Sequence, residues 1–140
     1  MNDPYGPPPT PGDHPPGPGV LTQEEKTWAL ASHVGALVSA WFAFGFLAPL
    51  LVMLLKGESP FVRRHAVESL NFQISLLIYS IVGTVLAVLL TIVTVGIGLI
   101  VIVPAVIVLA LIALILIIVA TVKAGNGEEY RYPCSIRLIS

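Results

Sequence analysis

The longest feature of the chain is an apolar run from Ser69 to Val122, which contains no Asp, Glu, Lys, Arg or His. The run has 54 residues. A helix needs about 20 residues to cross the hydrocarbon core of a bilayer, so the run is long enough for two crossings. The stretch Thr94–Gly98 near its middle contains two glycines and is the natural place for a turn. The pattern therefore predicts a hairpin of two membrane spans, at about 69–94 and 98–122.

A second apolar segment, from Thr27 to Leu55, contains no Asp, Glu, Lys or Arg. We interpret it as one further span at about 28–55, with Gly45 and Pro49 as positions where it can kink. A re-entrant hairpin is the alternative, although 29 residues are short for two passes. Small side chains recur on it every four residues, a spacing that lets helices approach closely in lipid. The candidate packing residues are Ala31, Gly35 and Ser39, and a second set is Ser32, Ala36 and Ala40.

The helix signals complete this division of the chain. Thr22–Glu25 fits a capping box, and Ser59-Pro60 fits a cap followed by the first helical residue. A helix over Pro60–Glu68 mixes apolar and basic side chains, which is typical of an interfacial lead-in to the second span. We predict an all-α integral membrane protein with three transmembrane helices. Its parts are a disordered Pro- and Gly-rich tail (1–21), a helical membrane domain (22–124) and a polar C-terminal tail (125–140).

Composition and charge agree with a membrane protein. The chain is 56% hydrophobic and only 11% charged, whereas soluble domains carry about 25% charged residues. The net charge of −1 gives no general attraction to nucleic acid. The partners that we expect are the lipid bilayer and either further copies of the chain or other membrane proteins, with no nucleic acid.

The distribution of Lys and Arg predicts a topology. With three spans, the 56–68 loop and the C-terminal tail share one side and hold six of the seven basic residues, while the other side has only Lys26. The positive-inside rule then places the C-terminal tail in the cytoplasm and the N-terminal tail on the outer side of the cell membrane. If the first apolar segment is instead a hairpin, the N-terminal tail lies inside as well.

The start of the second span carries a polar face. Glu68, Asn71, Ser75 and Tyr79 are spaced to share one side of a helix, and Arg64 is placed to pair with Glu68. Polar groups in hydrocarbon need hydrogen-bond partners, so this face must look toward other helices or toward water. Two interpretations remain open: hydrogen bonds that hold this helix to the first span, or the polar mouth of a path or recognition groove. The candidate residues of this region are Arg64, His65, Glu68, Asn71, Gln73, Ser75 and Tyr79.

Signals for catalysis or metal binding are missing from the sequence. His33 and His65 lie on opposite sides of the membrane in a three-span protein, and Cys134 is the only cysteine. No serine stands in a nucleophile motif such as G-x-S-x-G. We therefore expect no enzyme, no cofactor and no metal. In the C-terminal tail, Tyr130, Arg131, Tyr132 and Arg137 are typical of a lipid headgroup surface.

Several short motifs together resemble a known family. They are His33 with Gly35, Pro49-Leu50, Pro60-Phe61-Val62, His65-Ala66, Glu68, Asn71-Phe72-Gln73, Ala124, Gly127 and Tyr130-Arg131-Tyr132-Pro133. Residues 26–140 resemble small bacterial membrane proteins of unknown function that are similar to the channel-type subunit of the chloroplast inner-envelope import translocon (Tic). The resemblance implies a polytopic α-helical membrane domain without a catalytic residue. It leaves two roles, a scaffold or accessory subunit of a membrane complex or, alternatively, a channel or translocon-like subunit that works as an oligomer.

Overall fold

A computed structural model describes residues 19–40 and 45–140. These residues form four α-helices and no strand, so the all-α prediction is confirmed. The helices are α1 (Gln23–Ala40), α2 (Leu47–Lys56), α3 (Pro60–Val93) and α4 (Leu99–Asn126). Most of the Pro-rich tail that is predicted to be disordered lies outside the described residues, as does the segment 41–44.

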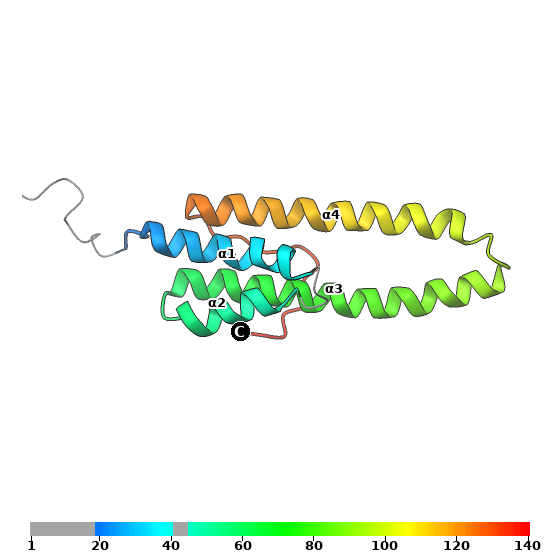
Figure 1. Ribbon diagram of the computed structural model, residues 1–140, viewed down its shortest axis with the longest axis horizontal. Helices are drawn as coiled ribbons and strands as arrows, with labels where there is room; N and C mark the ends of the chain where they lie inside the picture. The colour runs from blue at the N-terminus through cyan, green and yellow to red at the C-terminus, as the bar shows by residue number, and fades with distance from the viewer. Residues whose placement is uncertain (1–18, 41–44) are drawn as a thin grey trace, which may run out of the picture.

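The helices α3 and α4 form a long hairpin, and α1 and α2 lie beside only one end of it (Figure 1). Among the described helices, α3 and α4 are long and apolar enough to cross a membrane. The predicted count of three transmembrane helices is wrong, because the apolar segment 28–55 is divided into α1 and the shorter α2.

The first apolar segment turns back on itself, which brings the start of α1 beside the end of α2. Lys56 Nζ lies 2.7 Å from Glu24 Oε1. The Ser59 hydroxyl donates to Glu25 Oε1 over 2.6 Å. The alternative of a hairpin is therefore the correct description, and the single kinked span is not.

The sequence contains local reasons for this hairpin. Pro49 lies in the first turn of α2, where a missing backbone N–H leaves no helical hydrogen bond unmade. Gly35 allows α1 and α2 to approach closely, since a Cβ added at this position would lie 2.6 Å from the Cβ of Ala48. Ser39, one turn further along α1, donates to the carbonyl oxygen of Gly45 over 3.1 Å.

The predicted capping signals are present in the structure. The Thr22 hydroxyl accepts from the Glu25 N–H at 3.1 Å, and the Glu25 carboxylate accepts from the Thr22 N–H at 2.8 Å. Hydrogen bonds from the Ser59 hydroxyl and from Thr22 hold the pKa of Glu25 below its usual range. Ser59 caps α3 and accepts from the Val62 N–H, with Pro60 as the first helical residue.

The predicted interfacial helix over Pro60–Glu68 is not a separate element. It forms the first part of α3, which continues without a break to Val93. Phe61, Val62 and His65 are buried against the other helices. This part of the chain therefore packs inside the protein.

The turn between α3 and α4 occupies the residues predicted for it, Thr94–Gly98. Gly96 has a φ of +88°, a left-handed conformation that suits glycine, and Val95 also has a positive φ. The Thr94 hydroxyl accepts from the Gly98 N–H at 2.9 Å. The helix α4 then runs without interruption through Pro104 to Asn126, and Gly127 caps its end with a φ of +80°.

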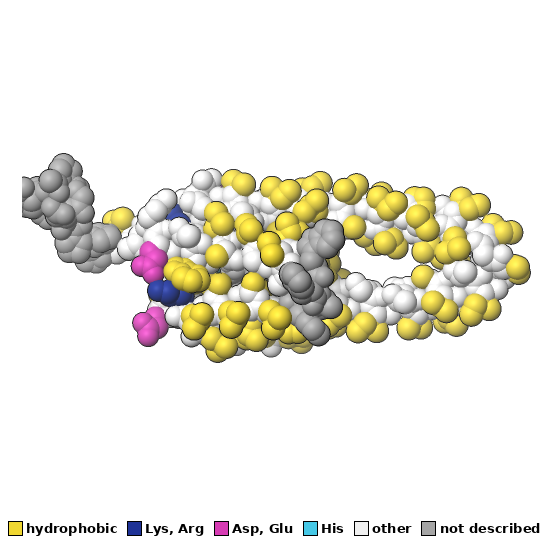
Figure 2. All heavy atoms as spheres, viewed as in Figure 1, with side chains coloured by type: hydrophobic (Ala, Val, Ile, Leu, Met, Phe, Trp, Pro, Cys, Tyr) yellow, Lys and Arg dark blue, Asp and Glu magenta, His cyan; other side chains and the backbone are white. Residues whose placement is uncertain are grey.

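The hairpin has two halves with different surroundings. We call the packed half the base: it contains α1, α2, α3 up to Tyr79, α4 from Ala113 and the C-terminal tail. We call residues 80–112 the outer hairpin. Every buried residue of the described chain belongs to the base, and no residue of the outer hairpin is buried. Figure 2 shows an opening between the two helices of the outer hairpin, and charged side chains at the opposite end of the molecule.

Candidate functional site

The polar face of α3 is covered by the C-terminal tail, residues 127–140. The tail runs along α3 as far as Tyr79, turns near Cys134, which has a φ of +59°, and returns along the same helix. We call Glu68, Asn71, Ser75 and Tyr79 the tail-docking face. All four bond to the backbone of the tail, so this face binds its own chain.

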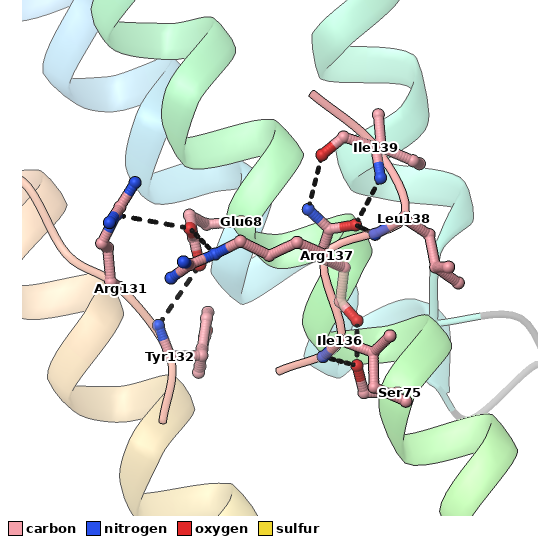
Figure 3. A network of polar contacts seen from close by, with 9 residues as sticks. Glu68, Ser75, Arg131, Tyr132, Ile136, Arg137, Leu138 and Ile139 are labelled. Atoms are coloured by element: carbon pink, nitrogen blue, oxygen red, sulfur yellow. Dashed lines mark hydrogen bonds and ion pairs between the residues drawn. The ribbon is translucent and has the colours of Figure 1, made fainter. Parts of the chain in front are cut away.

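Asn71 makes the densest set of these contacts. Its Oδ1 accepts from the N–H groups of Leu138 at 3.0 Å and Ile139 at 2.9 Å, and its Nδ2 donates to the Ile139 carbonyl oxygen at 2.9 Å. The Ser75 hydroxyl accepts from the Ile136 N–H at 2.7 Å (Figure 3). A tail without secondary structure thus obtains from side chains the hydrogen bonds that a helix supplies internally.

Tyr79 lies where the tail turns. Its hydroxyl donates to the carbonyl oxygen of Cys134 over 2.8 Å. The outer hairpin begins directly after this residue, so the tail covers α3 as far as the boundary between the two halves.

Glu68 and Arg64 each form ion pairs with residues of the tail, and they do not pair with each other. Glu68 accepts from the Tyr132 N–H at 3.3 Å and lies 3.9 Å from Arg131 and 3.6 Å from Arg137. Arg64 lies 2.6 Å from Glu129. The predicted Arg64–Glu68 pair is therefore wrong, because the tail supplies nearer partners to both residues.

Beneath the tail lies a buried chain of three aromatic side chains, which we call the histidine chain. Tyr132 Oη is 3.0 Å from His33 Nδ1, and His33 Nε2 is 2.9 Å from His65 Nδ1. His65 Nε2 is 3.0 Å from the carbonyl oxygen of Glu128. The prediction that His33 and His65 lie on opposite sides is wrong, because the α1–α2 hairpin brings them into contact.

The direction of the hydrogen bonds follows from one end of the histidine chain. The Glu128 carbonyl can only accept, so His65 Nε2 carries the proton and His65 Nδ1 accepts from His33 Nε2–H. His33 Nδ1 then accepts from the Tyr132 hydroxyl. Burial raises the pKa of Tyr132, which keeps this donor protonated, and burial lowers the pKa of His33. Two neutral imidazoles thus satisfy every ring nitrogen and tie α1, α3 and the tail together.

Tyr132 donates a hydrogen bond to His33, and its ring also anchors the tail by apolar packing. Only 3% of the residue is exposed, and its ring stacks on Phe72 with centroids 3.9 Å apart. The sequence predicts Tyr132 at a lipid headgroup surface, whereas the fold encloses it. Nothing local distinguishes Tyr132 from the more exposed Tyr130 nearby, because the depth of each ring depends on how the tail returns along α3.

The remaining candidates lie elsewhere in the base. Gln73 does not point to the tail: its Oε1 lies 2.7 Å from where a Cβ on Gly45 would stand, beside the α1–α2 connection. Gly35 lies at the contact between α1 and α2, and Ser39 bonds across to Gly45. Ala31 is half-buried on the same side of α1.

A comparison with protein families matches residues 24–139, which include both the tail-docking face and the histidine chain. The chain belongs to the magnetosome magnetite crystal formation protein family. No curated protein matches the chain, and no solved structure matches it. The broader prediction of a small membrane protein family agrees with this result, but nothing supports the predicted similarity to the Tic translocon.

The magnetosome family adds no catalytic interpretation to the site. Its description names crystal formation and no enzymatic reaction. Among the described residues, no group of three or more His, Cys, Asp or Glu side chains could hold a metal ion. The contacts described above are hydrogen bonds, ion pairs and ring packing, which hold the tail and helices in one arrangement.

Proposed function

We propose that the protein is an integral membrane accessory subunit, anchored by the α3–α4 hairpin. The observation that carries this proposal is the outer hairpin, whose side chains are apolar and exposed along both helices. Soluble proteins rarely leave so large a continuous apolar surface in water. A bilayer removes this surface from water without any further protein contact.

The length of the hairpin supports this placement. A hydrocarbon core of about 30 Å corresponds to about 20 helical residues. Counted back from Thr94, this length reaches Ile74, close to the limit of the base. Counted forward from Leu99, it ends before Lys123. The charged residues of both helices then lie outside the core.

The structure changes the topology that we propose. A Cβ at Gly127, which follows α4, would lie 3.2 Å from Leu21, so the start of the described chain and the C-terminal tail are at the same end. All seven Lys and Arg residues belong to the base or directly precede or follow its helices. The positive-inside rule then favours a cytoplasmic base and a turn at 94–98 outside the bacterial inner membrane. The N-outside prediction depended on three spans and is withdrawn with them.

Cysteine labelling of intact cells tests this topology. In a Cys134→Ser background, an impermeant thiol reagent is expected to label Val95→Cys and to leave Thr10→Cys unlabelled until lysis. Labelling of Thr10→Cys in intact cells would contradict the placement of the N-terminal tail on the cytoplasmic side with the base. Recovery of the protein in the soluble fraction after carbonate extraction would overturn the membrane anchor itself.

The accessory role rests on the opening between the two outer helices. Packed helices normally lie 8–10 Å apart along their contact. The outer parts of α3 and α4 instead leave an opening between them, and their apolar side chains are exposed, which suits a helix of a second copy or of another membrane protein (Figure 2). The channel alternative lacks such support, because the polar residues assigned to a path bond to the tail instead.

Photo-crosslinking in native membranes tests the accessory role. A photoreactive residue at Leu86 or Ile107, both in the outer hairpin, is expected to give adducts with protein, at twice the chain mass if the partner is a second copy. The matched control is Ile117, which is 6% exposed and packed in the base, and should give none. Adducts with lipid alone from both outer positions would contradict the accessory role and leave only an anchor.

The magnetosome family suggests where such a subunit works. Its description concerns formation of magnetite crystals, and an accessory membrane protein can organise a compartment without touching the mineral. The proposal therefore assigns the chain a structural role in the membrane.

A further inference from the structure

Between α3 and the tail lies a hollow of about 440 Å³, which we call the arginine hollow. It is lined by four of the seven cationic residues of the chain: Arg63, Arg64, Arg131 and Arg137. The side-chain carboxylates in its lining are Glu68 and Glu129, and Arg63 donates to the main-chain oxygen of Ser140 over 2.9 Å. Four guanidinium groups thus outnumber the two side-chain carboxylates, and the charge of this concave site stays positive even when a main-chain carboxylate at Ser140 is counted.

The two carboxylates do not satisfy the four arginines equally. Glu129 is held by Arg64 at 2.6 Å, a close ion pair. Glu68 is shared by Arg131 and Arg137, which lie 3.9 Å and 3.6 Å from the same oxygen, beyond the range of good hydrogen bonds. Figure 3 shows these two arginines approaching Glu68 from opposite sides.

Both arginines that share Glu68 keep most of their hydrogen-bonding capacity. The side chains of Arg131 and Arg137 are 75% and 50% exposed. Each guanidinium has five N–H donors in a planar fork that matches the oxygens of a phosphate, and it stays charged at every physiological pH. A phosphate between them would accept charge-assisted hydrogen bonds from both guanidinium groups, through N–H donors that the single Glu68 oxygen does not engage.

We propose that the arginine hollow binds a phosphate group, presented by the headgroup of an anionic lipid. Glu68 lies six residues before Ile74, or about 9 Å along the helix from the edge of the hydrocarbon core in the proposed placement. This distance puts the hollow close to the headgroup layer. The lipid as the source of the phosphate rests on the proposed membrane anchor, whereas the phosphate chemistry of the hollow does not.

Ligand titration of the full chain in a neutral detergent tests the proposal. The probes are phosphatidylglycerol, phosphatidylcholine as the neutral lipid, and inorganic phosphate, each followed by the rise in thermal midpoint with concentration. Phosphatidylglycerol is expected to bind saturably and phosphatidylcholine is not. Arg131→Gln and Arg137→Gln should each weaken this binding about tenfold or more, the usual effect of losing a charged hydrogen bond.

Two further variants keep the test specific. Lys123→Gln removes the same charge from a residue that pairs with Glu128 outside the arginine hollow, and should leave binding unchanged. Glu68→Gln removes the carboxylate that competes for both arginines and should tighten binding. A variant that merely unfolds the protein does not tighten binding, so Glu68→Gln remains informative if the arginine variants fold poorly.

The possible outcomes test the phosphate site in the arginine hollow independently of the proposed membrane anchor. Inorganic phosphate that binds with the same dependence on the variants, without binding of phosphatidylglycerol, would support the phosphate site and assign it to a soluble anion. Equal weakening by Lys123→Gln and by the arginine variants would overturn the site in favour of general charge attraction. Binding of neither anionic probe would overturn it outright, even if carbonate extraction shows the anchor to be in the membrane.

Discussion

The helix α3 passes through two regions that share its backbone geometry and differ in everything around it. Up to Tyr79 it is covered by α1, α2 and the tail, and its polar face bonds to tail backbone. Beyond Tyr79 most of its side chains are apolar and exposed, and none is buried. The comparison teaches that protein contacts fix the base, whereas the outer hairpin takes its surroundings from outside the chain.

The largest expected difference between the two regions comes from truncating one large side chain in each. Tyr132→Ala removes a buried ring that stacks on Phe72 and leaves His33 without its donor. We expect a loss of about 3–5 kcal/mol in the free energy of unfolding, as for other buried aromatic residues. Leu109→Ala in the outer hairpin should change it by less than about 0.5 kcal/mol, because Leu109 is already exposed.

Unfolding by SDS in mild-detergent micelles measures both variants of this pair. Similar losses for Tyr132→Ala and Leu109→Ala would mean that the outer hairpin also holds itself together. The distinction between a base fixed by protein contacts and an outer hairpin without them would then be wrong.

The next largest effect concerns the docking of the C-terminal tail on α3. Asn71→Leu leaves the three tail backbone groups of Leu138 and Ile139 without their partner. We expect a loss of about 2 kcal/mol in tail docking, which corresponds to cleavage by trypsin after Arg137 that is faster by a factor of about 30. Gln73→Leu is the matched control, since Gln73 points to Gly45 and not to the tail. Equal cleavage of the two variants would contradict a docked tail.

Replacing one glycine in each region by alanine is expected to have a smaller effect, of opposite sign in the base and in the outer hairpin. Gly35→Ala forces a Cβ to within 2.6 Å of Ala48 Cβ, and overpacking of this kind costs about 1–3 kcal/mol. Gly83→Ala in the outer hairpin meets nothing within 4 Å, and should stabilise the helix by about 0.5–1 kcal/mol through its higher helix propensity. Thermal unfolding of the two variants should therefore shift in opposite directions, and a shift in the same direction would refute the close α1–α2 contact.

The smallest predicted effect is a pH dependence that belongs to the base alone. Burial lowers the pKa of His33 from its ordinary 6.5, so below that pH the unfolded chain binds a proton that the folded protein does not. The free energy of unfolding should then fall by about 1 kcal/mol per pH unit as the pH drops below 6. Unfolding between pH 7 and 5 measures this slope, which His33→Gln should flatten. An unchanged slope in His33→Gln would assign the pH dependence to another group, such as His65, whose pKa burial also lowers.

Much of the fold could be predicted because its signals are local. The absence of charge from Ser69 to Val122 requires apolar surroundings, and the glycines at 96 and 98 place the turn. The hydroxyl of Ser59 with Pro60 starts α3 where expected. The spacing of Glu68, Asn71, Ser75 and Tyr79 also places these residues on one face, because helical periodicity alone decides it.

The sequence by itself thus determined an all-α chain with an apolar hairpin, its helix starts and its polar face. Only the tertiary structure decided that the first apolar segment folds into α1 and α2, since Gly45 and Pro49 permit both a kink and a turn. It also decided what the polar face binds and that His33 meets His65 and Tyr132. The physical reason is sequence separation: caps, turns and periodicity act within a few residues, whereas the contacts of His33 with His65 and Tyr132 join residues that are 32 and 99 positions apart.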